Sequence, residues 1–440
     1  MPRSPTLPLS SRNRLKTPST DALGLPSRTL PRTIRPVSIP PQPQPLPGLV
    51  QSPRDPAFVQ DPYPFYDRAR ALGPLFLWQD YGFPCAAGHA EVGALLRDRR
   101  FGRELPSALR PARPDHLADF YALDDRSMLD REPPSHTRLR GLVLRAFTSR
   151  RIAALGPEIT TLSEGLIDRL PRGEFDLIAG VAEPLPVVVI ARLLGVPEEM
   201  APQLLAWSHA MVAMYQARRN PEVEACANTA ARDFAAFLRD YVAERRLRPG
   251  DDLITALIAA EAEGDRLDTD ELIATCVLLL NAGHEATVHA IGNGVAAILG
   301  AGLDAARLFA DPAATAATVE EVLRFDPPLH LFTRFALADV EVFGHRFRTG
   351  DTVGCLLAAA NRDPARFPDP DRFDPVRPAG PHLAFGAGIH FCVGAPLARA
   401  ELATALPILF ARRPGLALAS PPAFADRYHF RGLAALRLTS

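Results

Sequence analysis

Apolar residues recur at helical spacing through the middle of this 440-residue chain. The spacing predicts helices over residues 138–147, 159–170, 222–246 and 268–299, because positions three and four apart share one helix face. The last of these helices is unusually long. A further helix is predicted over residues 395–409. The centre of the chain is therefore expected to be a succession of helices.

Strand signals are short and lie near the two ends of the helical region. They surround residues 74–87 and return at 339–347 and 433–438, next to glycine turns. Residues 360–387 are rich in proline, aspartate and glycine. An irregular segment of that length is usually functional or disordered. The pattern predicts a mainly helical protein with minor strands and one long irregular loop.

The first 50 residues differ from the rest of the chain. They are rich in proline, serine and arginine, and Asp21 is their only acid. Five prolines between positions 40 and 47 rule out a regular helix there. We predict a disordered tail over residues 1–50 or an over-extended gene start, and a transit peptide is less favoured because such peptides are amphipathic helices. Residues 51–440 are predicted to form a single domain.

Composition narrows the class of protein. Hydrophobic residues make up 47% of the chain and the formal net charge is -1, which gives no reason to expect nucleic-acid binding. The five cysteines are an odd number and none form a C-x-x-C pair, which favours a cytoplasmic location over a disulfide framework. No apolar run of about 18 residues occurs, so we expect no membrane anchor.

The strongest chemical signal is the loop Phe385-Gly-Ala-Gly-Ile-His-Phe-Cys392-Val-Gly394. Its glycines, among them Gly386, permit tight turns and close approach of the backbone to a flat ligand. Because a helix is predicted from residue 395, the Cys392 thiol should lie near a helix N-terminus, where backbone N–H groups lower its pKa.

Three other interpretations compete for this loop. A dinucleotide loop is disfavoured because Phe391 occupies the place of the third glycine and no preceding β-α-β unit is visible. A zinc site of Cys392 and His390 lacks a second ligand pair nearby. The third alternative is a buried cysteine with a structural role only.

The loop resembles the haem-binding signature of the cytochrome P-450 family, F-x-x-G-x-H-x-C-x-G. Phe385, Gly388, His390, Cys392 and Gly394 fill that signature without a gap. The resemblance implies a mainly α fold, a helical triangular prism with small β-sheets, over about residues 55–438. It also implies a haem b (iron protoporphyrin IX) cofactor with Cys392 as the iron ligand.

Cationic residues elsewhere match the family's propionate ligands. His136 and Arg140 are four apart after Pro133 and Pro134, so they share one helix face, where an anion between them is expected or else a solvated basic surface. The resemblance implies that these two residues, Arg334 and His390 hold the two haem propionates.

Glu321 and Arg324 lie three apart, a spacing that on its own predicts a surface ion pair. The resemblance to the family's E-x-x-R segment implies instead a buried pair. Its expected partner is an arginine of the proline-rich loop, either Arg362 or Arg372, with Arg372 preferred.

The long predicted helix contains Asn-Ala282-Gly283-His-Glu285-Ala286-Thr287, which resembles the family's A-G-x-[D/E]-T segment over the distal haem face. Gly283 costs a helix about 1 kcal/mol relative to alanine, which suggests close contact with a ligand. Glu285 matches the acid, but Ala286 stands where a threonine is usual. This departure puts the usual proton relay in doubt and leaves Glu285 and Thr287 as the candidate catalytic residues.

Three functions follow from the resemblance. The first is a monooxygenase that inserts one oxygen atom into a lipophilic small molecule and takes electrons from a separate ferredoxin and its reductase. The second is a peroxide-driven peroxygenase or a haem-thiolate rearrangement enzyme, and the third is a non-catalytic haem sensor or carrier. Arg138, Arg145 and Arg399 are candidate docking residues for the electron donor. Family topology also predicts an apolar pocket lined by four segments: residues 103–127, 278–286, 329–333 and 429–430.

Overall fold

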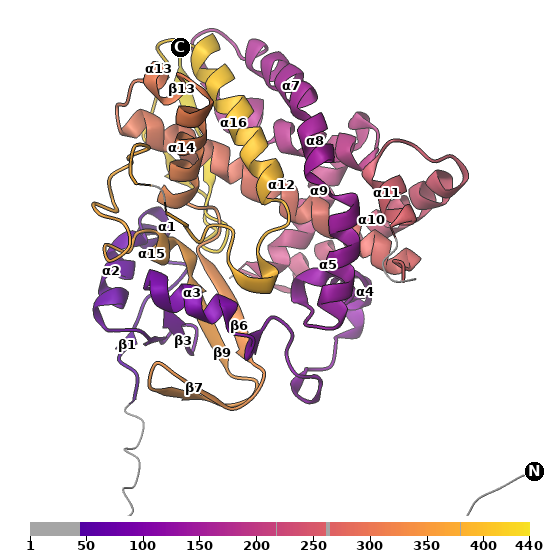
Figure 1. The fold of residues 1–440 in the computed structure, drawn as a ribbon, viewed down its shortest axis with the longest axis vertical. Coiled ribbons are helices and arrows are strands. Elements are labelled where there is room, and N and C mark those ends of the chain that lie inside the picture. The colour runs from indigo at the N-terminus through magenta and orange to yellow at the C-terminus, as the bar shows by residue number, and fades with distance from the viewer. Residues whose placement is uncertain (1–44, 217, 261–264, 379) are drawn as a thin grey trace, which may run out of the picture. The chain divides into compact units, whose positions relative to one another are not determined.

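The longest helix of the computed structural model is α12 (Thr269–Gly300), which crosses the centre of the folded unit (Figure 1). It begins with a capping box, in which the Asp268 side chain accepts from the Glu271 N–H and the Glu271 side chain accepts from the Asp268 N–H. The bounds predicted from apolar spacing, residues 268–299, are confirmed to within one residue at each end. The structure describes residues 45–216, 218–260, 265–378 and 380–440.

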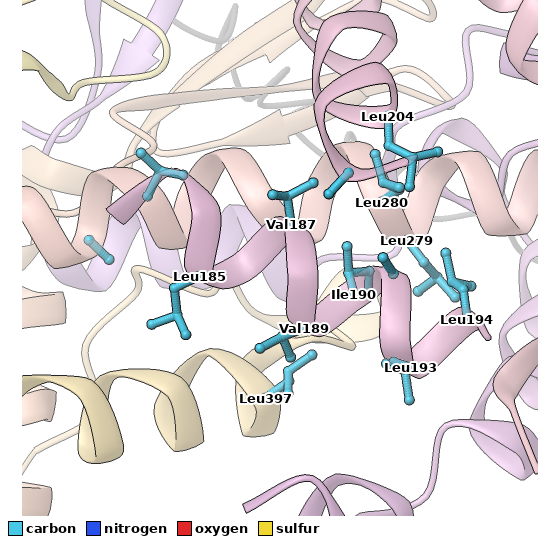
Figure 2. Packing of buried hydrophobic residues seen from close by; sticks show 14 of the residues in the cluster. Leu185, Val187, Val189, Ile190, Leu193, Leu194, Leu204, Leu279, Leu280 and Leu397 are labelled. Carbon is cyan, nitrogen blue, oxygen red and sulfur yellow. The ribbon is translucent and has the colours of Figure 1, made fainter. Parts of the chain in front are cut away.

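Helix α8 (Pro184–Leu194) is apolar on nearly every side and fills the space beside α12. Figure 2 shows Val187 and Ile190 directed toward the α9 and α12 side, while Val189 meets Leu397 of α16 (Ala395–Arg412). Helices α7, α9, α12 and α16 pack around this core. The helix that carries the residues after Cys392 is thus fixed against the helix that crosses the centre.

Most remaining helices follow the predicted order. The helices predicted over 138–147 and 159–170 each begin three residues earlier than expected, and the helix predicted over 222–246 begins one residue earlier. The helices other than α8, α12 and α16 are α1 (Pro56–Gln60), α2 (Tyr63–Ala71), α3 (His89–Arg97), α4 (Ala118–Asp124), α5 (Ser135–Ala146), α6 (Ser149–Ala154), α7 (Gly156–Asp168), α9 (Ala201–Val212), α10 (Pro221–Leu247), α11 (Leu253–Ala259), α13 (Ala305–Leu308), α14 (Pro312–Phe325) and α15 (Leu357–Asn361).

The largest sheet lies beside α1, α2, α3 and α15, on the opposite side of the unit from α10 and α11 (Figure 1). It has six strands in the order β1-β2-β3-β9-β6-β4, with bounds β1 (Gly48–Leu49), β2 (Phe76–Trp78), β3 (Phe83–Ala86), β9 (Thr352–Leu356), β6 (Leu331–Ala336) and β4 (Phe101–Gly102). The smaller sheets join β10 (Ala417–Leu418), β13 (Arg437–Thr439) and β5 (Glu174–Asp176), then β11 (Ala423–Phe424) with β12 (Leu433–Ala435), and β7 (Val340–Val342) with β8 (His345–Phe347). The mainly helical fold with small sheets is confirmed.

The predicted tail over residues 1–50 needs a correction at its end. Gly48 and Leu49 form strand β1 and pair in parallel with Leu77 and Trp78. Residues 1–44 lie outside the described part of the chain. The described residues from 45 onward belong to one compact unit. Among the described residues, no helix is both long and apolar enough to cross a membrane.

Helix α14 ends in the predicted Glu321–Arg324 pair, which is buried and bidentate, with nitrogen–oxygen distances of 2.7 and 2.8 Å. The prediction that Arg372 or Arg362 joins this pair through its side chain was wrong. Arg372 contributes only its backbone carbonyl, at 3.3 Å from Arg324 Nη2, whereas Arg377 Nε lies 3.4 Å from Glu321 Oε2. Arg362 instead pairs with Asp371 at 3.2 Å. The pair therefore attaches the irregular loop to α14 largely through backbone carbonyls.

Candidate functional site

The loop that ends at Cys392 is closed by its own backbone. The Cys392 N–H donates to the Phe385 carbonyl at 3.0 Å. Gly386 and Gly388 have φ of 67° and 73°, a left-handed conformation that disfavours other residues. A Cβ at Gly388 would also overlap the carbonyl oxygen of Leu96. The two glycines are thus required by the turn and by close packing on α3.

Helix α16 begins directly after the loop, as predicted, with Gly394 at its N-cap. The N–H groups of Gly394 and Ala395 lower the pKa of the Cys392 thiol, as do Arg140 and Arg399, but burial outweighs them and raises it. The backbone N–H groups act in the expected direction, while protein atoms packed around the loop disfavour the charged thiolate, although Cys392 itself is exposed.

Arg334 on β6 is 2% exposed, and its one hydrogen bond among the described residues is to the Thr333 carbonyl, at 3.0 Å. No described carboxylate lies within ion-pair distance of it. Burial lowers its pKa to about 10, so the guanidinium remains charged at neutral pH. A buried cation without a counter-ion is costly, and an anionic group bound beside it would offset that cost.

The two histidines proposed for the propionates lie against each other. The rings of His136 on α5 and His390 in the loop have centroids 4.3 Å apart, and His390 Nε2 lies 2.9 Å from Glu132 Oε1. Burial, with His390 and Arg140 close by, lowers the pKa of His136 to about 4. Arg140 Nη2 donates to the Phe391 carbonyl at 2.7 Å, so it is attached to the loop itself.

These residues fit a haem with two propionates. The buried Arg334 lacks a counter-ion, and His136, Arg140 and His390 gather beside the cysteine loop. A cysteine thiol stands at the end of that loop, where it would ligate the iron. Side chains from α5, β6 and the cysteine loop are thus available to hold the group that the sequence resemblance implied.

A cavity of about 260 Å³ lies on the α12 side of the site and is mostly apolar. All four predicted segments contribute to it. Its lining comprises Arg103, Leu123, Asp124, Ser127, Leu129, Met211, Val212, Tyr215, Ala274, Val277, Leu278, Asn281, Ala282, Leu329, Leu331, Phe332, Thr333, His429 and Phe430.

Sequence reasoning missed the part of the lining that follows α9. Tyr215 donates to Asp124 Oδ1 at 2.8 Å, and burial raises the pKa of Asp124 to about 6. Asn281, within the predicted segment 278–286, also lines the cavity directly before Ala282. Its side-chain oxygen is buried without a hydrogen-bond partner among the described residues. These groups join Arg103, Ser127, Thr333 and His429 as the polar part of a mostly apolar lining.

Glu285 does not line the cavity. Its carboxylate is 3% exposed and lies 3.2 Å from His209 Nε2, 3.5 Å from His289 Nε2 and 3.0 Å from Arg427 Nη1. Burial alone would raise the pKa of Glu285, but the neighbouring histidines outweigh it and hold the pKa below its ordinary value. The residue is therefore ionised within a cluster of cationic and imidazole groups.

Thr287 and Gly283 also face away from the cavity lining. The Thr287 hydroxyl donates to the Gly283 carbonyl at 3.1 Å and lies beside Glu401 of α16. A Cβ at Gly283 would meet Ile190 of α8 at 3.6 Å, an ordinary contact. The structure therefore gives no support to the expectation that Gly283 touches a ligand, whereas Ala282 does line the cavity.

The candidate docking arginines are largely neutralised within the chain. Arg138 pairs with Glu271, and Arg399 Nε lies 2.5 Å from Glu320 Oε1. Two of the three predicted residues are thus engaged by carboxylates, which weakens the idea of a basic patch at this place.

Comparison with known proteins gives consistent matches. The family model described as Cytochrome P450 matches residues 313–412. Cytochrome P450 monooxygenase PikC of Streptomyces venezuelae is 39% identical over 83% of this chain and 87% of its own length. Cytochrome P450 107B1 of Saccharopolyspora erythraea is 45% identical over 67% of this chain and 72% of its own. The solved structure of P450BioI with hexadec-9Z-enoic acid ligated acyl carrier protein has a TM-score of 0.82 at 33% identity, and covers 87% of this chain and 99% of that one.

Proposed function

This chain belongs to the cytochrome P450 family and is a monooxygenase of that family, and on this premise we propose that it oxidises a lipophilic small molecule bound in the cavity beside α12. The observation that carries the proposal is the position of Ala282. It lines the cavity on α12, and α12 packs on α16, the helix that follows Cys392. This packing supports the proposal that a substrate in the cavity would lie beside a haem held by that cysteine.

We propose haem b as the cofactor. When bound, it would activate dioxygen so that one oxygen atom enters the substrate and the other leaves as water. Cys392 would ligate its iron, Arg334, His136, Arg140 and His390 would hold its propionates, and Phe385, Gly386 and Gly394 would shape the loop around the sulfur. Ala282, which lines the cavity, would contact the haem, whereas Gly283, which packs toward Ile190 of α8, would not.

The cavity favours a largely apolar substrate with at least one hydrogen-bonding group. Leu123, Leu278 and Phe332 line its wall, while Asn281 offers an unpaired acceptor. The solved relative P450BioI is in complex with an acyl carrier protein ligated with hexadec-9Z-enoic acid, which is a lipophilic group. Orientation by Asn281 would select which carbon of the substrate is oxidised.

Electrons are proposed to come from a separate ferredoxin and its reductase in the cytoplasm. Because Arg138 and Arg399 already have carboxylate partners, the exposed Arg145 is the better candidate for contact with an acidic donor. We expect the rate of reduction to fall as ionic strength rises, since charge attraction steers such encounters.

The test uses the haem-loaded protein and Cys392→Ala. The reduced wild-type protein under carbon monoxide should show the absorption band of thiolate-ligated haem, and the variant should lose it. A screen of lipophilic compounds should then give substrate-induced spectral shifts, and labelled dioxygen should place one labelled atom in the product. Retention of the band by Cys392→Ala would refute the ligand, and product without label would refute the monooxygenase reaction.

A second function is favoured by Ala286, which has no hydroxyl to position the water that carries protons. Either a polar group of the substrate holds that water, or the enzyme uses peroxide instead of dioxygen and donor electrons. Ala286→Thr should raise product formed per electron for substrates that lack a polar group, with Ala296→Thr on the same helix as control. Turnover driven by peroxide alone at the rate of the reconstituted system would favour the peroxygenase.

A further inference from the structure

A second cluster of ligand-type side chains lies outside the cavity, where α9 crosses α12. His209 of α9 and His284 with Glu285 of α12 offer two ring nitrogens and one carboxylate oxygen that all lie within 4.8 Å of one another. Among the residues that the structure describes, no other group of three or more histidine, cysteine, aspartate or glutamate side chains meets that condition. We propose that this cluster is a binding site for a divalent transition metal, with zinc as the expected ion.

The atom spacing suits tetrahedral coordination. Glu285 Oε2 lies 3.2 Å from His209 Nε2 and 3.6 Å from His284 Nε2. Zinc at about 2.0–2.1 Å from nitrogen and oxygen ligands holds neighbouring ligand atoms about 3.3 Å apart. Glu285 Oε2 is thus close to this spacing from both nitrogens, and the nitrogens of His209 and His284, which lie within 4.8 Å of each other, would draw together around the ion.

His284 provides an independent sign that a ligand is expected there. Its side chain is fully buried, and Nε2 has no hydrogen-bond partner among the described residues. Nδ1 of the same ring lies 3.4 Å from Ser208 Oγ. A buried imidazole with one nitrogen oriented by a hydrogen bond and the other directed at a carboxylate is the arrangement that metal-binding histidines adopt.

The two oxygens of the Glu285 carboxylate face different partners. Oε1 faces Arg427 Nη1 at 3.0 Å and His289 Nε2 at 3.5 Å, whereas Oε2 faces His209 and His284. Arg427 and His289 can thus orient the ligand without occupying the oxygen that meets the ion. The Glu285 carboxylate stands between these two residues and the ion, so it reduces their electrostatic repulsion of a bound cation. The half-exposed His209 provides the entry path and leaves room for water as a fourth ligand.

The proposed metal site lies next to the cavity. His209 lies two residues before Met211, and both α9 and α12 contribute to the cavity lining. A metal bridging the two helices would hold α9 against α12 and slow the movements that admit a substrate. Zinc binding can be measured separately from substrate oxidation. Absence of zinc binding would therefore not contradict the proposed monooxygenase activity, and absence of that activity would not contradict the zinc site.

The experiment measures zinc uptake by the haem-loaded protein in equilibrium dialysis after removal of metals with a chelator. We expect one zinc per chain. His209→Gln and His284→Gln each remove a ligand and should weaken zinc binding more than a hundredfold, while Ser208→Ala removes only the orienting contact and should weaken it about tenfold. His116→Gln, which alters an exposed histidine paired with Glu224, is the control and should bind as the wild type does.

Haem content and the carbon monoxide spectrum of every variant report whether it is folded, and X-ray absorption at the zinc edge should show two imidazoles and one carboxylate. Wild-type protein without bound zinc would overturn the proposal and leave an ion pair between α9 and α12. Equal zinc binding by wild type and His209→Gln would also overturn it, because the metal would then sit on other histidines.

Discussion

At the scale of single residues, the site depends on cations that have no counter-ion of their own. Arg334 is buried on β6 without a carboxylate among the described residues, whereas Arg103 beside it pairs with Asp130 at 2.6 Å. Proximity of Arg103 further lowers the pKa of Arg334. A buried guanidinium without a counter-ion lowers the stability of the folded protein, because its charge is poorly solvated. A bound anion beside it would offset that loss.

Arg334→Ala should therefore weaken haem retention by about 1–3 kcal/mol, because one propionate would lose its buried partner. Transfer of haem to apomyoglobin measures the effect as a faster loss. Arg346→Ala is the matched control, since Arg346 is mostly exposed on β8 and should release haem at the wild-type rate. Equal rates for both variants would show that Arg334 holds no propionate.

Glu401 on α16 gives a prediction about pH. It is 1% exposed, Oε2 has no hydrogen-bond partner among the described residues, and burial raises its pKa from the usual 4.5 to about 8. A group whose pKa is raised on folding contributes stability that is fully present below pH 4.5 and is lost as the pH rises through 8. The folded protein should thus become less stable between pH 5 and pH 9.

Glu401→Gln cannot ionise and should remove that part of the pH dependence. The free energies of unfolding of variant and wild type, measured in denaturant from pH 5 to pH 9, should diverge by on the order of 3 kcal/mol in favour of the variant at high pH. Glu199→Gln, at an exposed position, should run parallel to wild type. A constant difference between Glu401→Gln and wild type would mean that Glu401 does not titrate in this range.

At the scale of elements, helix α14 and the irregular loop are joined through one buried ion pair. Glu321 accepts from Arg324 and from the Asp374 N–H at 2.7 Å, while Arg324 donates to the carbonyls of Asn361 and Pro370, each at 2.9 Å. The loop that leads to Cys392 is therefore positioned by contacts that saturate both side chains.

Glu321→Gln should destabilise the protein by about 3–5 kcal/mol, because the buried Arg324 would lose its counter-charge. Chemical denaturation followed by circular dichroism measures the loss. Glu320→Gln is the control one residue earlier. Its carboxylate pairs with Arg399 at a partly exposed site, so the expected cost is about 0–1 kcal/mol. Similar costs for both variants would argue against a special role for the buried pair.

The bounds of a helix could be predicted from the sequence, whereas contacts between distant segments could not. Helix α12 was predictable because its capping box and its apolar positions are local signals. The arginine that joins Glu321 was not, since Arg362, Arg372 and Arg377 all lie in one irregular loop, where backbone geometry decides which of them reaches the carboxylate. The strand order of the main sheet also depends on contacts between distant segments.

The same limit applies to the site. Cys392 and its loop were recognisable because five defined positions occur within ten residues. The surroundings of Glu285 were not, because Arg427 is 142 positions away and His209 belongs to another helix. The chemistry of an acid on α12 thus depends on partners that no local pattern contains.

At the scale of the whole molecule, backbone hydrogen bonds show where the folded unit begins. The Leu77 N–H donates to the Pro47 carbonyl and the Gln79 N–H donates to the Leu49 carbonyl, each at 2.9 Å. Leu46 and Leu49 also pack against buried clusters. Gly48 and Leu49 therefore belong to the main sheet and Leu46 packs beside it, although the proline content of residues 45–50 resembles that of the preceding segment.

Two deletions test this boundary. Removal of residues 1–44 should leave the unfolding free energy and the carbon monoxide spectrum unchanged, because the segment has too little apolar content to dock firmly. Removal of residues 1–50 should lower stability by about 1–3 kcal/mol, since strand β2 would lose two backbone hydrogen bonds and the packing of Leu46 and Leu49. Thermal unfolding of both truncated proteins at equal haem content makes the comparison. If both deletions are neutral, strand β1 contributes no stability. If both are costly, residues 1–44 have a structural role that their composition does not predict.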